Sequence, residues 1–227
     1  IDGTGNDSAN VLVGNGGVDT VSYEGSSAGV TIDLSVNAQG GGGDGKGDYL
    51  AGIENVIGSA NNDKLSGDAG NNRLSGGAGN DTLTASAGND VLLGEDGDDA
   101  INLGANLTTA DDIDGGDGSD TLVLAGNYAA GFSFGTKLRN IETIALGAGF
   151  DYKLTLADST NTVGLVVDGS ALGVGDNLVL NGAAETIATL SATGGNGDYP
   201  ITGGTGNDSI AGGGGTDVLA SGADNDT

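Results

Sequence analysis

The sequence contains no cysteine, histidine, methionine or tryptophan. The absence of cysteine excludes a disulfide scaffold, and the absence of both cysteine and histidine argues against zinc and copper sites. Without histidine there is no serine triad and no zinc-protease motif, and without cysteine there is no thiol nucleophile. Together these absences argue against most hydrolytic enzymes.

Large apolar side chains are scarce as well, because the 227 residues include eight aromatics, five Tyr and three Phe, and a single proline. Forty-eight glycines add a large entropic cost of folding. The apolar area that could offset this cost is small, so an ordinary compact globule is not expected. No apolar run reaches the roughly 18 residues of a membrane span, so no membrane-spanning segment is expected.

Basic residues are few: 6 Lys and Arg stand against 32 Asp and Glu, which leaves a formal net charge of −26. Nucleic-acid binding depends on Lys and Arg, so we expect no nucleic-acid partner. A folded state with this charge repels itself unless cations lie among the carboxylates. Twenty-seven of the acids are Asp, a residue common in turns, which predicts that the charge lies at corners of the chain.

A nine-residue period runs through the middle of the chain. From Gly58 the sequence divides into GSANNDKLS, GDAGNNRLS, GGAGNDTLT, ASAGNDVLL and GEDGDDAIN. The sixth place holds Asp63, Asn72, Asp81, Asp90 and Asp99, and the eighth place holds Leu65, Leu74, Leu83, Leu92 and Ile101. A twelve-residue unit then restores the phase, and GGDGSDTLV continues it. Internal repeats of this length are typical of solenoids.

Similar units near both ends divide the chain into four parts. We expect a short repeat block with a spacer at residues 1–48, the main repeat block at 49–123, strand-rich spacer coils at 124–193 and a third repeat block at 194–227. The spacers contain the runs VTIDL, YKLTL, GLVVD, NLVLN and ETIATL, which are typical of strands. Both ends of the sequence fall inside a repeat without a signal-peptide pattern, so we expect a piece of a longer protein.

The spacing predicts an all-β fold, a parallel β-roll or β-helix solenoid. Two units make one coil of 18 residues, with a turn and a short strand on each side and the eighth-place aliphatics stacked inside. Sixth-place residues 18 apart then lie about 4.8 Å apart, where two carboxylates repel by roughly 3 kcal/mol. A cation midway would lie about 2.4 Å from each, which suits calcium and is too long for magnesium. Several calcium ions, bound in the turns with help from turn carbonyls, are therefore the expected cofactor.

The repeats GGAGNDTLT, GGTGNDSIA and GGDGSDTLV resemble those of the repeats-in-toxin (RTX) family, which form a calcium-binding parallel β-helix. The resemblance covers about half of the chain and implies a Gram-negative protein that a type I system exports unfolded and that calcium folds outside the cell. It also implies sixth-place carboxylates and turn backbone groups as ligands. Here these are Asp19, Asp63, Asp81, Asp90, Asp99, Asp111, Asp120, Asp208, Asp217 and Asp226, with the turn positions Gly76, Ala78, Gly94, Asp96, Gly115, Asp117, Gly203 and Thr205. The sixth-place Asp is replaced by another residue at Asn10, Glu54, Asn72, Glu142 and Tyr199, so weak or absent sites are expected there.

The function expected is a non-enzymatic, calcium-folded structural module of a secreted or cell-surface protein, such as a surface-layer, adhesin or accessory repeat domain. Self-association and attachment to a cell surface stay open as partner interactions. The alternative is a polysaccharide-active β-helix enzyme that works with paired carboxylates. An ice- or glycan-binding face would need a threonine or aromatic ladder, which the sequence lacks. A flexible glycine-rich linker would not keep a nine-residue register.

Individual aspartates have different expected roles. Asp33, Asp158 and Asp168 lie outside the repeats and are interpreted as solvated turn residues. Asp81 has acidic neighbours 18 residues away on both sides, so each of its two oxygens is expected to serve one ion. Replacing Asp81 with Ala should therefore raise the calcium needed for folding far more than Asp158→Ala or Asn72→Ala. Without calcium the chain is expected to be largely disordered.

Overall fold

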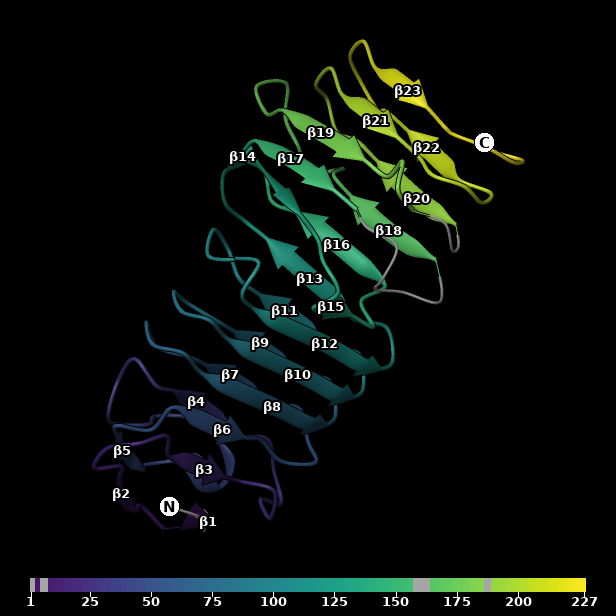
Figure 1. The fold of residues 1–227 in the computed structure, drawn as a ribbon. Helices are drawn as coiled ribbons and strands as arrows, with labels where there is room; N and C mark the ends of the chain where they lie inside the picture. The colour runs from purple at the N-terminus through teal and green to yellow at the C-terminus, as the bar shows by residue number, and fades with distance from the viewer. Residues whose placement is uncertain (1–2, 5–7, 157–163, 186–188) are drawn as a thin grey trace. The chain divides into compact units, whose positions relative to one another are not determined.

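The computed structural model describes residues 3–4, 8–156, 164–185 and 189–227 (Figure 1). By its contacts the chain divides into two compact units, Ile1–Asp120 and Thr121–Thr227. The described residues form 23 strands, and their only helical segment is a three-residue 3-10 turn, Gly43–Gly45. The expected four-part division by repeat content stays a prediction. No helix in these described ranges has the length and apolarity needed to cross a membrane.

The first unit is a parallel β-solenoid with two main sheets. One sheet has the strand order β1-β3-β6-β8-β10-β12, the other contains β4-β7-β9-β11, and β2 pairs with β5. The strands are β1 (Gly3–Thr4), β2 (Val11–Val13), β3 (Thr20–Ser22), β4 (Thr31–Asp33), β5 (Tyr49–Ala51), β6 (Asn55–Ile57), β7 (Lys64–Ser66), β8 (Arg73–Ala78), β9 (Thr82–Thr84), β10 (Val91–Asp96), β11 (Ala100–Asn102) and β12 (Asp112–Asp117). Consecutive strands alternate between the two main sheets from β6 onward, as Figure 1 shows for β7 to β12.

The predicted 18-residue coil is confirmed by the strand register. Leu65 pairs with Leu83, and Leu74 pairs with Leu92. The offset grows to 21 residues between Leu92 and its partner in β12 because the intervening unit has twelve residues. The eighth-place side chains of the main repeat block are fully buried between the two sheets, and each buried Leu contributes about 1.5–3 kcal/mol. These side chains form the core of the first unit.

The two sides of each coil differ in a way that the repeat alone does not predict. Strands β7, β9 and β11 have the expected three residues, whereas β8, β10 and β12 have six. The longer strands continue through the first three places of the following repeat, where Glu95 pairs with Gly77 and Gly116. Pairing can resume there because the second place adopts a positive φ, 107° at both glycines and 78° at Glu95. The expected six-residue turn is therefore shorter on this side.

The second unit is also a parallel β-solenoid. Its sheets have the orders β13-β16-β18-β20-β22 and β14-β17-β19-β21-β23. The strands are β13 (Thr121–Leu124), β14 (Tyr128–Ser133), β15 (Leu138–Arg139), β16 (Thr143–Leu146), β17 (Tyr152–Thr155), β18 (Leu165–Asp168), β19 (Leu178–Asn181), β20 (Leu190–Thr193), β21 (Pro200–Thr202), β22 (Ser209–Ala211) and β23 (Val218–Ala220). The all-β parallel solenoid predicted from the sequence is therefore confirmed.

Most of the predicted spacer strands are present. The runs VTIDL, YKLTL, GLVVD and NLVLN contain β4, β17, β18 and β19. In the run ETIATL, residues 186–188 lie outside the described residues, and Leu190 begins β20. Aromatic side chains add to the core here, since the rings of Tyr128 and Tyr152 stack at 6.1 Å and those of Phe132 and Phe134 meet edge to face at 5.1 Å.

Candidate metal centre

The sixth-place aspartates form a hydrogen-bonded ladder along one edge of the first unit. The amide of Asp63 donates to Asp81 Oδ1 at 2.8 Å, and the amide of Asp81 donates to Asp99 Oδ1 at 2.7 Å. Asp99 in turn donates to Asp120 Oδ1 at 2.8 Å. One oxygen of each carboxylate therefore binds the backbone of the preceding coil. The predicted 18-residue stacking brings these residues together.

The other predicted sixth-place residues follow the same rule. On the second edge of the first unit, Asn72 donates to Asp90 Oδ1, and Asp90 donates to Asp111 Oδ1. In the second unit the same bonds run from the amides of Leu190, Tyr199 and Asp208 to Oδ1 of Asp208, Asp217 and Asp226. Near the beginning of the chain Glu54 plays the role of the sixth-place Asp, because its Oε2 accepts the amide of Asp19 at 2.8 Å. The ladder is thus a property of the sixth place in both units.

The second carboxylate oxygen is the one that lacks a partner. Oδ2 of Asp81 and Oδ2 of Asp99 are buried and accept no hydrogen bond. Each lies over the first-place glycine of its own repeat, so a Cβ on Gly76 would overlap Asp81 Oδ2 and a Cβ on Gly94 would overlap Asp99 Oδ2. Leaving a charged, buried oxygen without a partner is costly. These two oxygens therefore mark places where a cation would fit.

Backbone carbonyls of the next coil approach the same places. The Cβ that would overlap Asp99 Oδ2 would also overlap the carbonyl of Gly115, and that on Gly76 would lie 2.8 Å from the carbonyl of Gly94. Carboxylate and carbonyl oxygens thus converge beside each first-place glycine. The arrangement recurs in the other repeats, where it joins Asp63 with Gly76, Asp19 with Gly52, and Asp208 with Ser221 beside Gly203. Glycine keeps this space open in these repeats, because a side chain on any of these glycines would fill it.

The pKa values of three sixth-place aspartates are raised, which is consistent with a site for a cation beside them. Burial, as the largest cause, raises the pKa of Asp81 to about 7, and the charges of Asp63, Asp99 and Glu95 raise it further, against a lowering by the amide of Asp63. Burial also raises the pKa of Asp90 and of Asp99. A carboxylate that accepts two or three hydrogen bonds normally has a lowered pKa. The pKa values of these aspartates are raised because burial disfavours the charged form more than the amide bonds favour it.

Other sixth-place aspartates have their second oxygen satisfied within the protein. Oδ2 of Asp63 accepts the amide of Ser59 at 2.5 Å, Oδ2 of Asp111 accepts the amide of Thr108 at 2.7 Å, and Oδ2 of Asp208 accepts the amide of Gly204 at 2.9 Å. Such oxygens are weaker candidates for binding a cation. Asp81 and Asp99 are consequently the strongest candidates among the aspartates predicted from the sequence.

The third-place residues predicted as ligands take part in backbone hydrogen bonds between successive coils. The carbonyl of Asp96 accepts the amide of Gly79, and the carbonyl of Asp117 accepts the amide of Gly97, both at 2.8 Å. The amides of Ala78 and Thr205 donate to carbonyls of the preceding coil, those of Ser59 and Glu185. A carbonyl has a second lone pair, so Asp96 and Asp117 keep a free acceptor site in addition to this bond. The role of all four as ligands stays a prediction.

The donor set suits a hard cation with mainly carbonyl ligands. In the described part of the chain no point gathers three or more His, Cys, Asp or Glu side chains. The carboxylate and carbonyl oxygens that converge beside Gly76 and Gly94 are of the kind that calcium prefers, and calcium takes six to eight oxygen ligands in flexible geometry. The residues present therefore fit calcium.

The departures from the repeat are explained by their contacts. Asn72 uses its side-chain oxygen to accept the amide of Asp68 and its amide group to bind the carbonyl of Glu54. Asp33 and Asp168 end strands β4 and β18 and accept the amides of Ser35 and Ser170 two residues on, as Asx turns do. Their interpretation as solvated turn residues stays a prediction. Asp158 lies outside the described residues, and its predicted role stays untested.

Sequence reasoning missed Asp48, a fully buried aspartate of the first unit. Its Oδ1 accepts the amide of Asn10 at 2.8 Å, as a sixth-place residue would, and its Oδ2 accepts the hydroxyl of Tyr23 at 2.9 Å. The signal was present, since GDGKGDYLA at residues 43–51 is itself a nonapeptide with an aliphatic, Leu50, in the eighth place. The hydroxyl of Tyr23 satisfies the oxygen that stays open in Asp81.

Sequence reasoning also missed a second ladder at the fifth place. The amide of Asn80 donates to Asn62 Oδ1 at 2.9 Å, and the amide of Asp98 donates to Asn80 Oδ1 at 3.1 Å. The second edge has the same bond between Asn89 and Asn71. These bonds run from the later coil to the earlier one, opposite to those of the sixth place. The sequence signal for this ladder is the Asn that precedes the sixth place in several repeats, as at Asn62, Asn71, Asn80 and Asn89.

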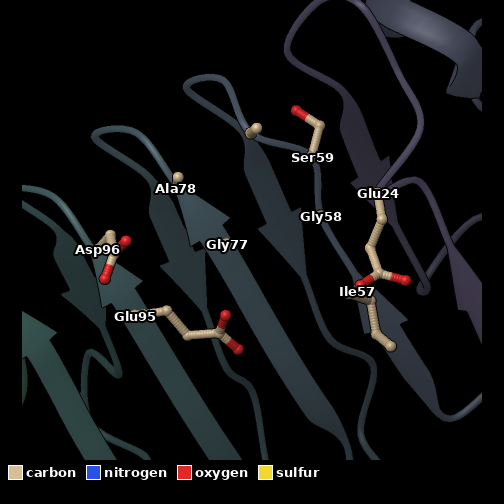
Figure 2. A pocket seen from close by; sticks show the side chains of 9 residues that line it. Glu24, Ile57, Gly58, Ser59, Gly77, Ala78, Glu95 and Asp96 are labelled. Carbon is tan, nitrogen blue, oxygen red and sulfur yellow. The ribbon is translucent and has the colours of Figure 1, made fainter.

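A surface hollow of about 330 Å³ lies beside the turns of the repeats that contain Asp63, Asp81 and Asp99. Figure 2 shows Glu24, Ser59, Glu95 and Asp96 around it, and no aromatic side chain lines it. Glu24 and Glu95 are exposed, and each accepts a serine hydroxyl. Residues 25–29 match the Gly-x-Ser-x-Gly pattern of nucleophilic serines, but the chain contains no histidine to act as the base. Neither feature amounts to a catalytic constellation.

The comparison with known families agrees with this geometry. The chain matches the family described as the RTX calcium-binding nonapeptide repeat (four copies) at residues 3–25, 49–83, 75–106, 108–125 and 193–227, which is more than half of its length. A search among curated proteins gave no match. The matched segments contain all of the sixth-place aspartates predicted as ligands. The chain therefore belongs to the RTX calcium-binding nonapeptide repeat family.

Proposed function

We propose that the chain is a calcium-folded structural module of a secreted or cell-surface bacterial protein. The observation that carries this proposal is the pair of buried carboxylate oxygens, Asp81 Oδ2 and Asp99 Oδ2, that accept no hydrogen bond and face carbonyls of the next coil. Membership of a calcium-binding repeat family supports the choice of ion. The small apolar core and the net charge of −26 explain why folding needs it.

The residues that would hold the ions come from two successive coils. Asp81 Oδ2 would act with the carbonyl of Gly94, and Asp99 Oδ2 with the carbonyl of Gly115. A bound calcium ion would neutralise the buried carboxylate and join oxygens of both coils. The aspartate Oδ1 atoms hold the coils in register through the sixth-place ladder, and the first-place glycines keep the space open. Ion binding and coil stacking are thus the same event, so binding energy is folding energy.

The proposed location follows from the ion requirement. RTX repeats are typical of secreted proteins. Sites with one carboxylate and mostly carbonyl ligands belong with the weak extracellular calcium modules, with dissociation constants of roughly 10⁻⁴–10⁻³ M. Such sites stay empty in a cytosol and fill outside the cell. This supports export of an unfolded chain through a type I system, and a role as a surface-layer, adhesin or accessory repeat domain without enzymatic activity.

A calcium titration of the full chain tests the proposal. Circular dichroism should change from a disordered to a β spectrum as calcium rises into the millimolar range, and excess chelator should reverse the change. Calorimetry on the same samples should count several ions. Magnesium at equal concentration is the matched control and should fold the repeat blocks poorly, because it requires shorter bonds and stricter octahedral geometry. Residues 58–120 remaining folded in excess chelator would refute the proposal.

A further inference from the structure

Two tyrosines of the second unit are buried in places where their hydroxyl groups bind only backbone. Tyr199 occupies the sixth place of its repeat and is fully buried. Its hydroxyl accepts the amide of Gly197 at 2.9 Å and donates to the carbonyl of Gly173 at 3.2 Å. Gly197 belongs to the same turn and Gly173 to the preceding coil. The side chain therefore joins the backbones of two coils.

The ring of Tyr199 lies where other repeats place a carboxylate oxygen. A Cβ on Gly194, the first-place glycine, would lie 2.6 Å from Tyr199 Cδ2 and would overlap the carbonyl of Gly212 in the next coil. In the main repeat block the same test on Gly94 meets a carboxylate oxygen and the next first-place carbonyl. An aromatic carbon thus replaces the open oxygen, and no charge is left to neutralise. The turn is filled by the side chain itself.

Tyr152, the first residue of β17, makes a similar connection outside the nonapeptide repeats. Its hydroxyl lies 2.9 Å from the carbonyl of Leu124 and 2.9 Å from the carbonyl of Gly147, which belong to successive coils because the amide of Gly147 donates to Leu124. Burial raises the pKa of both Tyr152 and Tyr199, so both hydroxyls stay protonated and able to donate at neutral pH. Each hydroxyl therefore binds backbone groups of two coils, as a bound cation would.

The distribution of aromatic residues follows the same division. Residues 121–202 contain six of the eight aromatics, whereas residues 50–127 before Tyr128 contain none. A buried aromatic side chain removes about 150–250 Å² from water. The coils that contain Tyr152 and Tyr199 therefore have aromatic burial that residues 50–127 lack.

We propose that the hydroxyl bonds of Tyr152 and Tyr199 take over the role of calcium in joining successive coils, so that the described coils of residues 121–156, 164–185 and 189–202 keep their fold without the ion while the aspartate repeats need it. This inference rests on the proposed function, since it divides the chain by calcium dependence. The third repeat block then has a preformed template, because β20 and β21 pair with β22 and β23. Calcium would order residues 203–227 onto strands that are already in place.

Hydrogen exchange of the full chain, read by mass spectrometry in excess chelator and in calcium, tests the inference. We expect peptides from residues 121–156 and 189–202 to stay protected in chelator, and peptides from 58–120 to gain protection only with calcium. Exchange of both sets in chelator would overturn the inference and leave the proposed function standing. Protection of residues 58–120 in chelator would overturn the proposed function, and the inference with it.

Variants of Tyr199 test the replacement directly. Tyr199→Asp restores the aspartate of the repeat and should add one calcium ion to the number counted by calorimetry. Tyr199→Phe keeps the ring, adds no ion, and should lower the protection of the Gly197 amide roughly tenfold through the lost hydroxyl bond. Tyr49→Phe is the control, since Tyr49 lies in the first unit and is 41% exposed. An unchanged ion count in a folded Tyr199→Asp protein, or unchanged protection in Tyr199→Phe, would refute the role of Tyr199.

Discussion

Replacement of Asp81 with Ala is the sharpest test of the metal centre. The change removes the acceptor of the Asp63 amide, a bond of 2.8 Å, and leaves a buried donor unpaired at a cost of about 1–3 kcal/mol. It also removes the open Oδ2 and with it one ion, worth about 1.4 kcal/mol when calcium is tenfold above its dissociation constant. Because Oδ1 already accepts a hydrogen bond, the structure favours the loss of one ion rather than the two expected from the repeat alone.

The size of the shift in the calcium midpoint follows from the number of ions. A loss of about 3 kcal/mol, shared among several ions that bind in one folding transition, raises the midpoint by roughly a few-fold. Circular dichroism gives the midpoint, and calorimetry gives the number of ions. We expect Asp81→Ala to lower the ion count by one and to loosen the main repeat block.

The controls separate ion loss from general destabilisation. Asn72→Ala removes two side-chain hydrogen bonds but no charge, so it should leave the ion count unchanged and shift the midpoint less. Asp33→Ala removes the hydrogen bonds to Ser35 at the end of β4, outside the ladder, and should do little. Asp158→Ala is expected to behave in the same way. If Asp81→Ala matched Asp33→Ala in both ion count and midpoint, the ligand role of Asp81 would be wrong, and its carboxylate would be a structural turn group only.

Two further predictions concern pH and the first-place glycines. The pKa of Asp81 in the fold, about 7, lies above its ordinary value of 3.8, so protonation of Asp81 stabilises the ion-free fold. This stabilisation is complete below pH 3.8 and is lost as the pH rises above about 7. Calcium must displace that proton, and its midpoint in circular dichroism should therefore be higher at pH 5.5 than at pH 8; equal midpoints would contradict this reasoning. Gly94→Ala should remove an ion in calorimetry because the new Cβ overlaps Asp99 Oδ2, whereas Gly25→Ala, whose Cβ meets nothing within 4 Å, should not; equal ion counts would show that the space beside Gly94 is not a site.

The sequence by itself determined the coil, the core and the ladder of aspartates. A nine-residue period with an aliphatic in the eighth place and Asp in the sixth repeats the same local geometry, so stacking follows from periodicity without knowledge of distant contacts. For this reason Leu65 and Leu83 pair as predicted, and Asp63 lies beneath Asp81. Spacer strands such as β17 and β18 were also predictable, because apolar alternation is a local signal.

The tertiary structure alone decided which oxygen of each carboxylate stays open and which turns need no ion. The amide of the preceding coil takes Oδ1 of Asp81, and this choice depends on the vertical offset between coils, which the sequence does not state. Asp48 meets Asn10 across 38 residues and an insertion whose path no period predicts. Tyr199 looks in the sequence like a lost ligand, but packing against the carbonyl of Gly173 makes it a replacement for one. Each of these outcomes arises from contacts between coils whose atomic detail the repeat does not state.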